Sequence, residues 1–240
     1  MELEILFEDG EALIINKPAG LPLDQPRAGG RSLEDHLETL TLGFQRQPAP
    51  VHRLDRDTSG CLLLARNPKA LKRFSAAFEA RAVAKRYLGV VNGVVEGEEG
   101  TIALSLSKIS SAADGWRMIA AKKGKPAITH WRKVKELNGL TLVEFRPETG
   151  RTHQIRVHAQ LGLGAALVGD PIYGDGEGAA RTLLHAVELT VEREGKPPVH
   201  AIAPIPADFA ALGFGEVEAV LEAGPETPAP ETQDEAPAGE

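Results

Sequence analysis

Only one cysteine, Cys61, occurs among the 240 residues, so the chain cannot form an internal disulfide bond. This fits a protein of the reducing cytoplasm, which is where we expect it. No apolar run approaches the roughly 20 residues that cross a bilayer. The acidic N-terminus, Met1-Glu2-Leu3-Glu4, lacks the basic region of a secretory signal. We therefore expect no association with a membrane.

An excess of basic residues is also missing. The formal net charge is -7, which taken alone argues against a nucleic-acid partner. Five of the acids lie in residues 223–240, a segment with four prolines, no Lys or Arg, and no large apolar residue. Such a segment cannot bury enough surface to offset the entropy of ordering. We predict a disordered acidic tail at 223–240 and a single, nearly neutral domain over 1–222 that can carry a basic face.

Patterns typical of metal sites are absent from the sequence. Neither Cys-x-x-Cys nor His-Glu-x-x-His occurs. His153 and His158 are five residues apart and point to different sides of a helix or a strand. His52 with Asp55 and Asp57 has suitable ligand types, but a structural histidine is the better interpretation. We predict no metal site.

Strand-like runs outnumber helices in this sequence. The Asn138-Gly139 pair predicts one hairpin turn, and Asn92-Gly93 predicts another that leads into Val94-Val95. The pattern from 96 to 124 is weak and predicts only small strands and loops. Strands are predicted at 12–15, 61–65, 83–91, 127–134, 140–145, 183–191 and 199–202. The sequence therefore predicts an α+β domain with a largely antiparallel mixed sheet flanked by helices, and with the active-site cleft across the sheet.

Three helices are predicted from caps and apolar periodicity. Ser32 is a good N-cap for a helix that ends near Gly43. Asn67-Pro68 is typical of a second helix start, and a third helix is expected over 152–161. The second helix has cations opposite its apolar stripe, which form either a solvated face or a phosphate-contacting face: Lys69, Lys72 and Arg73.

The stretch from His52 to Gly60 holds five ionisable side chains directly before the predicted strand 61–65. Asp55 is its main candidate for chemistry, because the neighbouring Arg53 and Arg56 would keep a carboxylate ionised. For a loop aspartate chosen blind, a capping or paired role is the commoner one. The Asp-x-Asp form of Asp55 and Asp57 also occurs in magnesium-dependent phosphatases, but there it follows a buried strand, whereas here the strand comes after it.

Tyr87 and Arg156 are further candidates. Tyr87 lies in a predicted strand between basic residues and Leu88, where a tyrosine usually packs against the sheet. Arg156 lies in a polar, cation-rich segment after Gly150, and an Asp–Arg pair at about 4 Å gains on the order of 4 kcal/mol before desolvation. The residues alone point to an enzyme that acts on an anionic substrate, and they leave the reaction open.

Six motifs in one order then resemble those of the RluA-type pseudouridine synthases. His52 to Gly60 resembles the family signature H-R-L-D-x-x-[ST]-S-G. The others are similar to N-K-P-x-G-[LM], K-x-Y-x-x-x-x-x-G, T-G-R-[TS]-H-Q-[IL]-R-V-H, G-D-x-x-Y-G and L-H-A. They lie at 16–22, 85–93, 149–158, 169–174 and 184–186, and the resemblance covers about residues 5–209.

The resemblance implies an enzyme that isomerises specific uridines to pseudouridine in structured ribosomal or transfer RNA, with neither metal nor cofactor. It implies that Asp55 is the catalytic carboxylate and acts at the ribose C1′ after base flipping. Tyr87 would stack on the base and take the proton from C5. Arg156 would pair with Asp55, and Ile155 would supply an apolar contact near the base.

The same resemblance implies how RNA is held. Arg53 would enter the space that the flipped base leaves. The RNA backbone would be held by further cations that share a face with Asp55, which include the basic side of the helix from Pro68 and Lys85, Arg86, Lys122, Lys123, Lys125 and Arg151. We expect a monomer. No domain precedes the first motif, so we expect target choice to come from this domain or from a partner. The alternative is a non-catalytic RNA-binding or RNA-folding protein on the same scaffold.

Overall fold

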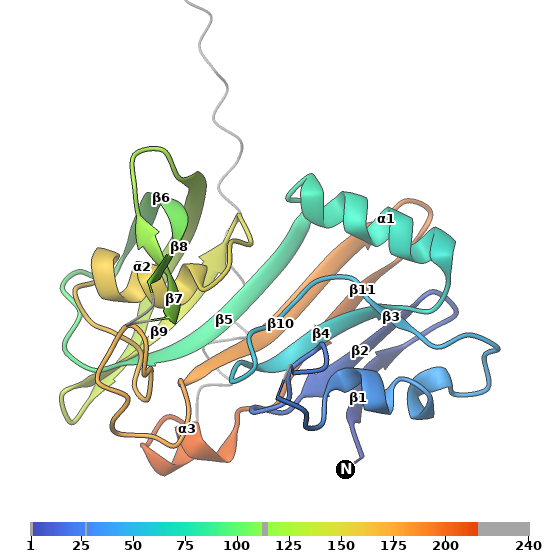
Figure 1. Ribbon diagram of the computed structural model, residues 1–240, viewed down its shortest axis with the longest axis horizontal. Coiled ribbons are helices and arrows are strands. Elements are labelled where there is room, and N and C mark those ends of the chain that lie inside the picture. Colours follow the sequence, from blue (N-terminus) through green and yellow to red (C-terminus); the bar gives the residue numbers. More distant parts are fainter. Residues whose placement is uncertain (1, 27, 112–114, 216–240) are drawn as a thin grey trace, which may run out of the picture.

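The computed structural model describes residues 2–26, 28–111 and 115–215, which form one α+β domain around a single sheet (Figure 1). The helices are α1 (Pro68–Glu79), α2 (Gln154–Gly162) and α3 (Ala207–Ala211), with 3-10 turns η1 (Leu33–His36) and η2 (Thr39–Thr41). The strands are β1 (Glu4–Glu8), β2 (Ala12–Lys17), β3 (Ala49–Pro50), β4 (Ser59–Ala65), β5 (Val83–Val91), β6 (Glu99–Ser111), β7 (Gly115–Ala120), β8 (Lys125–Leu137), β9 (Leu140–Pro147), β10 (Leu184–Arg193) and β11 (Lys196–Ile202).

The strand order is β1-β2-β4-β10-β5-β9-β8-β6-β7, with β11 paired to β10 and β3 paired to β4. Every described pairing of these strands is antiparallel except that of β4 with β10. The prediction of a largely antiparallel mixed sheet is confirmed. In Figure 1, β5 and β10 run between a part that holds β6 to β9 with α2 and a part that holds β1 to β4 with α1.

Local sequence signals account for several of these elements. The Asn67 side chain accepts a hydrogen bond from the Ala70 amide, and Pro68 occupies the first position of α1. Ala70 and Phe74 of this helix are buried, and Phe74 belongs to the same core cluster as Ile14 and Leu63. Strands β2 and β4 are buried on both faces, which explains their continuous apolar runs.

Three predictions of local structure are wrong. Asn92-Gly93 makes no hairpin, because the Asn92 amide donates to Ala166 and the chain leaves the sheet after Val91. Residues 96–124 contain the long strand β6 and also β7. The expected helix after Ser32 is replaced by η1 and η2, although Asp35 does cap the Ser32 amide at 2.8 Å.

Residues 216–240 lie outside the described part of the chain, and with them the predicted tail at 223–240 and the end of the predicted 1–222 domain. Among the described helices, none is long and apolar enough to cross a membrane.

Candidate active site

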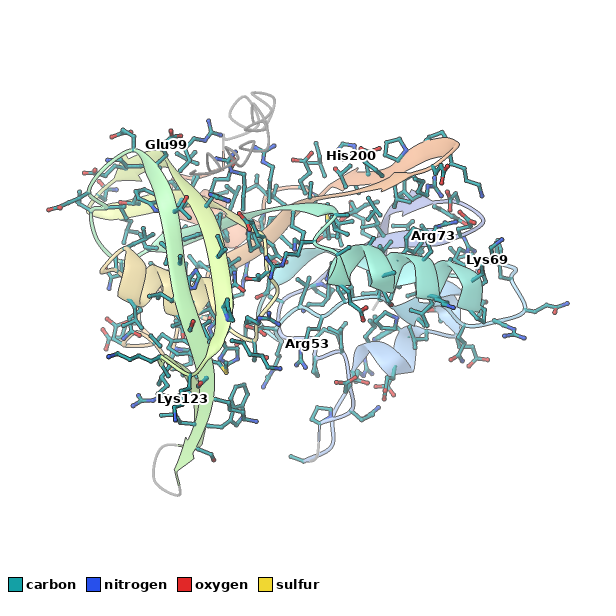
Figure 2. All side chains as sticks on the ribbon, turned by 90° about the horizontal axis from the view of Figure 1, so that it is seen from above. Arg53, Lys69, Arg73, Glu99, Lys123 and His200 are labelled. Carbon is teal, nitrogen blue, oxygen red and sulfur yellow. The ribbon has the colours of Figure 1, made fainter. Side chains whose placement is uncertain are left out.

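A cavity of about 460 Å³ is lined by residues of four of the six motifs, those at 52–60, 85–93, 149–158 and 184–186. Its walls come from the loop before β4, the end of α1, the cleft-facing side of β5, the start of α2 and Leu184 of β10. Figure 2 places Arg53 between the α1 side and the β6–β8 side of the molecule. The predicted site residues that line the cavity are Arg53, Asp55, Lys85, Tyr87, Arg151, Ile155 and Arg156.

Two cations, Lys17 and Arg181, donate hydrogen bonds to the backbone of the loop that carries Asp55. Thr58 donates its amide to the Asp55 carbonyl at 3.1 Å, which closes a tight turn. The Lys17 ammonium, fully buried, donates to the Arg56 carbonyl at 3.0 Å, and Arg181 donates to the Asp57 carbonyl at 2.9 Å. Burial lowers the pKa of Lys17 to about 7. These bonds fix the loop backbone and thereby the direction of the Asp55 side chain.

The parallel pairing of β4 with β10 joins two motifs. Gly60 has φ +104° and pairs with Ala186, and a Cβ at Gly60 would lie 2.2 Å from the Ala186 carbonyl oxygen. Only glycine fits so close to another backbone. Next to it, the Ser59 hydroxyl lies 2.9 Å from Nδ1 of the buried His185. Gly60 therefore allows β4 to approach β10 closely.

Arg156 faces Asp55, as predicted. Its Nη1 lies 3.6 Å from Asp55 Oδ2, while Nε and Nη2 donate to the Asp170 carboxylate at 2.7 Å each. Burial works against the charge of Asp170, but the bonds from Arg156 hold the pKa of its carboxyl below the usual range. Asp170 is a site residue that sequence reasoning missed, although its motif was recognised.

His153 was also missed as a cavity residue. Its Nε2 lies 3.8 Å from Asp55 Oδ2, and its Nδ1 lies 2.9 Å from the hydroxyl of Tyr173. Both residues belong to recognised motifs, but no local pattern announces the contact. Their side chains meet only because α2 begins beside the loop 169–174.

Tyr87 and Lys85 are two residues apart on β5 and both face the cavity. Burial, with Asp55 nearby as a second cause, raises the pKa of the Tyr87 hydroxyl. Burial lowers the pKa of the Lys85 ammonium, which lies 5.8 Å from the ring centre of Phe78. Tyr87 and Lys85 therefore bring an aromatic ring and a cation to the lining of the cavity, with Asp55 near the Tyr87 hydroxyl.

Arg86 was predicted to contact RNA, and this is wrong. It lies on the other face of β5, is 6% exposed, and pairs with Glu144 at 2.8 Å and with Glu188 at 2.7 Å. Adjacent residues of a strand point to opposite faces, so Lys85 and Arg86 cannot both line one cleft. Arg86 is a structural residue inside the sheet.

The α1 cations that were predicted to contact phosphate do not line the cavity. Arg73 donates to both carboxylate oxygens of Glu11, at 3.2 and 2.6 Å, and so packs against the loop between β1 and β2. Lys69 lies at the end of α1 away from Arg53 in Figure 2, whereas Phe78 at the opposite end lines the cavity. In the same view, Lys123 lies on the β6–β8 side of the molecule, away from α1. Lys122, Lys123 and Lys125 are all exposed.

The remaining members of the His52–Gly60 stretch have structural contacts. His52 accepts a hydrogen bond from the Leu63 amide at 3.0 Å and stacks on Phe78, and burial lowers its pKa to about 3. Arg56 donates to the Gly20 carbonyl at 3.3 Å. In the described parts of the chain, no three His, Cys, Asp or Glu side chains are grouped as metal ligands would be.

Known proteins are similar to this chain in sequence and in fold. The family model described as RNA pseudouridylate synthase matches residues 11–161. An uncharacterized RNA pseudouridine synthase of Zymomonas mobilis is 55% identical over 88% of this chain and 97% of its own length. The ribosomal large subunit pseudouridine synthase D of the same organism is 35% identical over 82% of this chain, which spans 63% of that protein. The solved structure of human RNA Pseudouridylate Synthase Domain Containing 1 has a TM-score of 0.72 at 27% identity, over 85% of this chain and 84% of that one.

Proposed function

Since this chain belongs to the RNA pseudouridylate synthase family, whose members isomerise uridine in RNA, we propose that it modifies specific uridines in structured ribosomal or transfer RNA with Asp55 as the catalytic group. Relatives named as ribosomal large subunit pseudouridine synthases favour ribosomal RNA as the first substrate to test. The observation that carries the proposal is that Asp55 and Tyr87 line one cavity, with Arg156 3.6 Å from the Asp55 carboxylate.

The proposed chemistry takes place at C1′ and C5 of one uridine. Asp55 acts at C1′ while the bond from C1′ to N1 breaks. The uracil turns in the cavity and C5 bonds to C1′. The neutral Tyr87 hydroxyl relays the C5 proton to water, and N1 gains a proton from water. A guanidinium attracts a nearby carboxylate, so Arg156 supports Asp55 in the position that this role needs.

A stacked uridine cannot reach Asp55, because the carboxylate stands inside the cavity wall. We infer that the nucleotide flips out of its stack, which costs a few kcal/mol and least in loops or mismatches. A volume of about 460 Å³ suits one nucleotide. Arg53 at the rim would fill the space left in the RNA, Tyr87 would stack on the flipped base, and Ile155 would contact it. Lys85 and Arg151 would meet the RNA backbone.

The test uses RNA labelled with tritium at uridine C5. The full chain is incubated with unmodified ribosomal RNA and, separately, with transfer RNA, without added metal ions. We expect tritium release and a pseudouridine peak in the nuclease digest from at least one pool. Release from neither pool would overturn the proposal.

The non-catalytic alternative is discriminated in the same assay. A binding protein on this scaffold would bind RNA and release no tritium. For the enzyme, we expect Asp55→Asn to abolish release while it keeps most of the RNA affinity, because phosphate contacts dominate that affinity. Loss of binding in Asp55→Asn would instead make Asp55 a structural residue.

A further inference from the structure

His153 is the cavity residue that the proposed chemistry leaves without a role. Its Nε2 and the Nη1 of Arg156 approach one and the same carboxylate oxygen, Asp55 Oδ2, at 3.8 and 3.6 Å. Neither distance is that of a hydrogen bond, but two positively polarised groups near one oxygen favour the carboxylate orientation in which that oxygen faces them. They leave the other oxygen, Oδ1, for the ribose.

The hydrogen bonds of Tyr173 favour one tautomer of His153. The Tyr173 hydroxyl accepts the Met118 amide at 2.9 Å and lies 2.9 Å from Nδ1 of His153. An oxygen that already accepts this bond can donate its proton to Nδ1. A neutral imidazole that accepts at Nδ1 carries its hydrogen on Nε2. That hydrogen points toward Asp55.

The orientation of the His153 ring is fixed from several sides. The ring stacks on Trp116 at 4.8 Å between centres and meets Tyr173 edge-on at 5.6 Å. Its backbone, at the N-cap of α2, has φ 53°, a left-handed conformation that costs free energy in a residue other than glycine. The surroundings therefore hold a strained residue in one pose beside the carboxylate.

The groups around His153 keep its ring neutral. Burial lowers the pKa of the imidazole and so do Arg156 and Arg53, whereas the carboxylates of Asp55 and Asp170 work in the opposite direction. Burial is the largest of these causes, and the net shift is downward.

We propose that His153 is a positioning residue for Asp55, which Tyr173 fixes as the Nε2–H tautomer, and that this N–H acts with Arg156 to orient the carboxylate toward the flipped ribose. The loop 169–174 supplies both supports, because Asp170 holds Arg156 and Tyr173 holds His153. Asp170 Oδ1 also accepts the Tyr173 amide at 3.1 Å, so the two supports are themselves tied together. The inference rests on the proposed function of Asp55.

The first test needs no substrate. Long-range proton–nitrogen NMR correlations of the imidazoles in the 15N-labelled full chain identify each histidine tautomer, and the signal missing in His153→Asn assigns His153. We expect a neutral ring with its proton on Nε2 at pH 7, and a mixture of tautomers in Tyr173→Phe. A proton on Nδ1 or a charged ring in the wild type would overturn the proposal.

The second test is kinetic and uses two replacements of His153. Asn tolerates the left-handed backbone and keeps a polar atom near Nδ1, but it has no atom at Nε2. We expect His153→Asn to lower kcat about 100-fold, as misplaced catalytic groups do, with the KM for RNA changed less than about twofold because phosphate contacts set it. His153→Gln restores a donor near Nε2 and should recover about tenfold of the lost kcat. Equal losses in both variants, or a wild-type kcat in His153→Asn, would refute the positioning role.

A double-mutant cycle tests the role of Tyr173. Tyr173→Phe should lower kcat in the wild-type chain and change it little in His153→Gln, because Gln has no acceptor at the Nδ1 position. Additive effects would show that Tyr173 does not act through His153.

The kinetic tests distinguish a failure of the His153 proposal from a failure of the proposed function. If the wild type forms no pseudouridine, the proposed function fails, and the NMR result alone decides the tautomer. If the wild type is active and Asp55→Asn is not, an unaffected His153→Asn overturns only the role of His153.

Discussion

The Asp170 carboxylate holds the Arg156 guanidinium through two hydrogen bonds of 2.7 Å, and this pair turns the third nitrogen of Arg156 toward Asp55. Asp170 is fully buried and Arg156 is 7% exposed. A planar fork bound at two nitrogens has little freedom to rotate. The position of Arg156 opposite Asp55 is therefore set by Asp170 and not by Asp55 itself.

Asp170→Asn should weaken the contact that orients Arg156 toward Asp55. It leaves the buried guanidinium without its anion, and we expect a loss of about 3–5 kcal/mol in the free energy of unfolding. We also expect kcat to fall more than the KM for RNA rises. Asp175→Asn is the control, because Asp175 is an exposed carboxylate of the same region. Urea denaturation and steady-state kinetics check both variants, and equal behaviour of the two would contradict the role of Asp170.

Lys85 and Arg86 form a matched pair on opposite faces of β5. Arg86→Met should cost about 1–3 kcal/mol of stability, because it removes the hydrogen bonds to Glu144 and Glu188 while Glu144 keeps Arg132 at 3.0 Å, and it should leave the RNA affinity of the folded fraction unchanged. Lys85→Met should do the reverse, with little loss of stability and a salt dependence of RNA binding reduced by about one charge. Urea denaturation and fluorescence anisotropy over a range of salt concentrations measure these effects. A reduced salt slope in Arg86→Met would restore its predicted RNA contact.

Lys17 makes stability depend on pH in a definite direction. Its pKa is about 7 in the folded chain against an ordinary value of 10.5, so between these values the unfolded chain binds the extra proton. Stability from this group therefore rises with pH over that window. Relative to Lys17→Met, the wild type should gain free energy of unfolding as the pH rises from 7 to 10, by up to about 1.4 kcal/mol per pH unit. A flat difference between wild type and Lys17→Met over this range would contradict the lowered pKa of the buried Lys17 ammonium.

The chain has two tyrosines, Tyr87 and Tyr173, and burial raises the pKa of both hydroxyls. Ultraviolet absorbance at pH 10.5 should therefore show less tyrosinate in the native protein than in denaturant, where both rings should ionise near their usual pKa of about 10. Circular dichroism at the same pH confirms that the chain is still folded. Ionisation of either ring near pH 10 in the native protein would contradict the raised pKa of that hydroxyl. Comparison with the Tyr87→Phe variant shows which ring ionises.

Local signals in the sequence predicted much of the fold. Asn67-Pro68 marked the start of α1, and Asn138-Gly139 marked the turn between β8 and β9. The alternation of Ile102, Leu104 and Leu106 with small residues was present in β6 and could have predicted that strand. The turn at Asn92-Gly93 was misread because tertiary contacts decide it. The Gly93 carbonyl accepts from Thr141 at 2.7 Å, and no strand follows in the described residues of that loop.

The site likewise contains residues that the sequence predicts and residues that it does not. Motif order brought Asp55, Tyr87 and Arg156 into one hypothesis, and the structure places them around one cavity. The alternation of side chains along a strand is by itself enough to exclude Arg86 from a cleft that Lys85 lines. Contacts such as those of His153 with Tyr173 join two loops 20 residues apart, and no local pattern of the sequence encodes them.

The central claim is that the Asp55 carboxylate carries out the isomerisation. Asp55→Asn and Asp57→Asn remove the same charge two residues apart in one loop, and only Asp55 stands beside Arg156 and His153. Single-turnover tritium release from C5-labelled RNA that the wild type modifies compares them directly. We predict no release above the enzyme-free control for Asp55→Asn and a rate near that of the wild type for Asp57→Asn. Tritium release by folded Asp55→Asn at the wild-type rate would contradict the account.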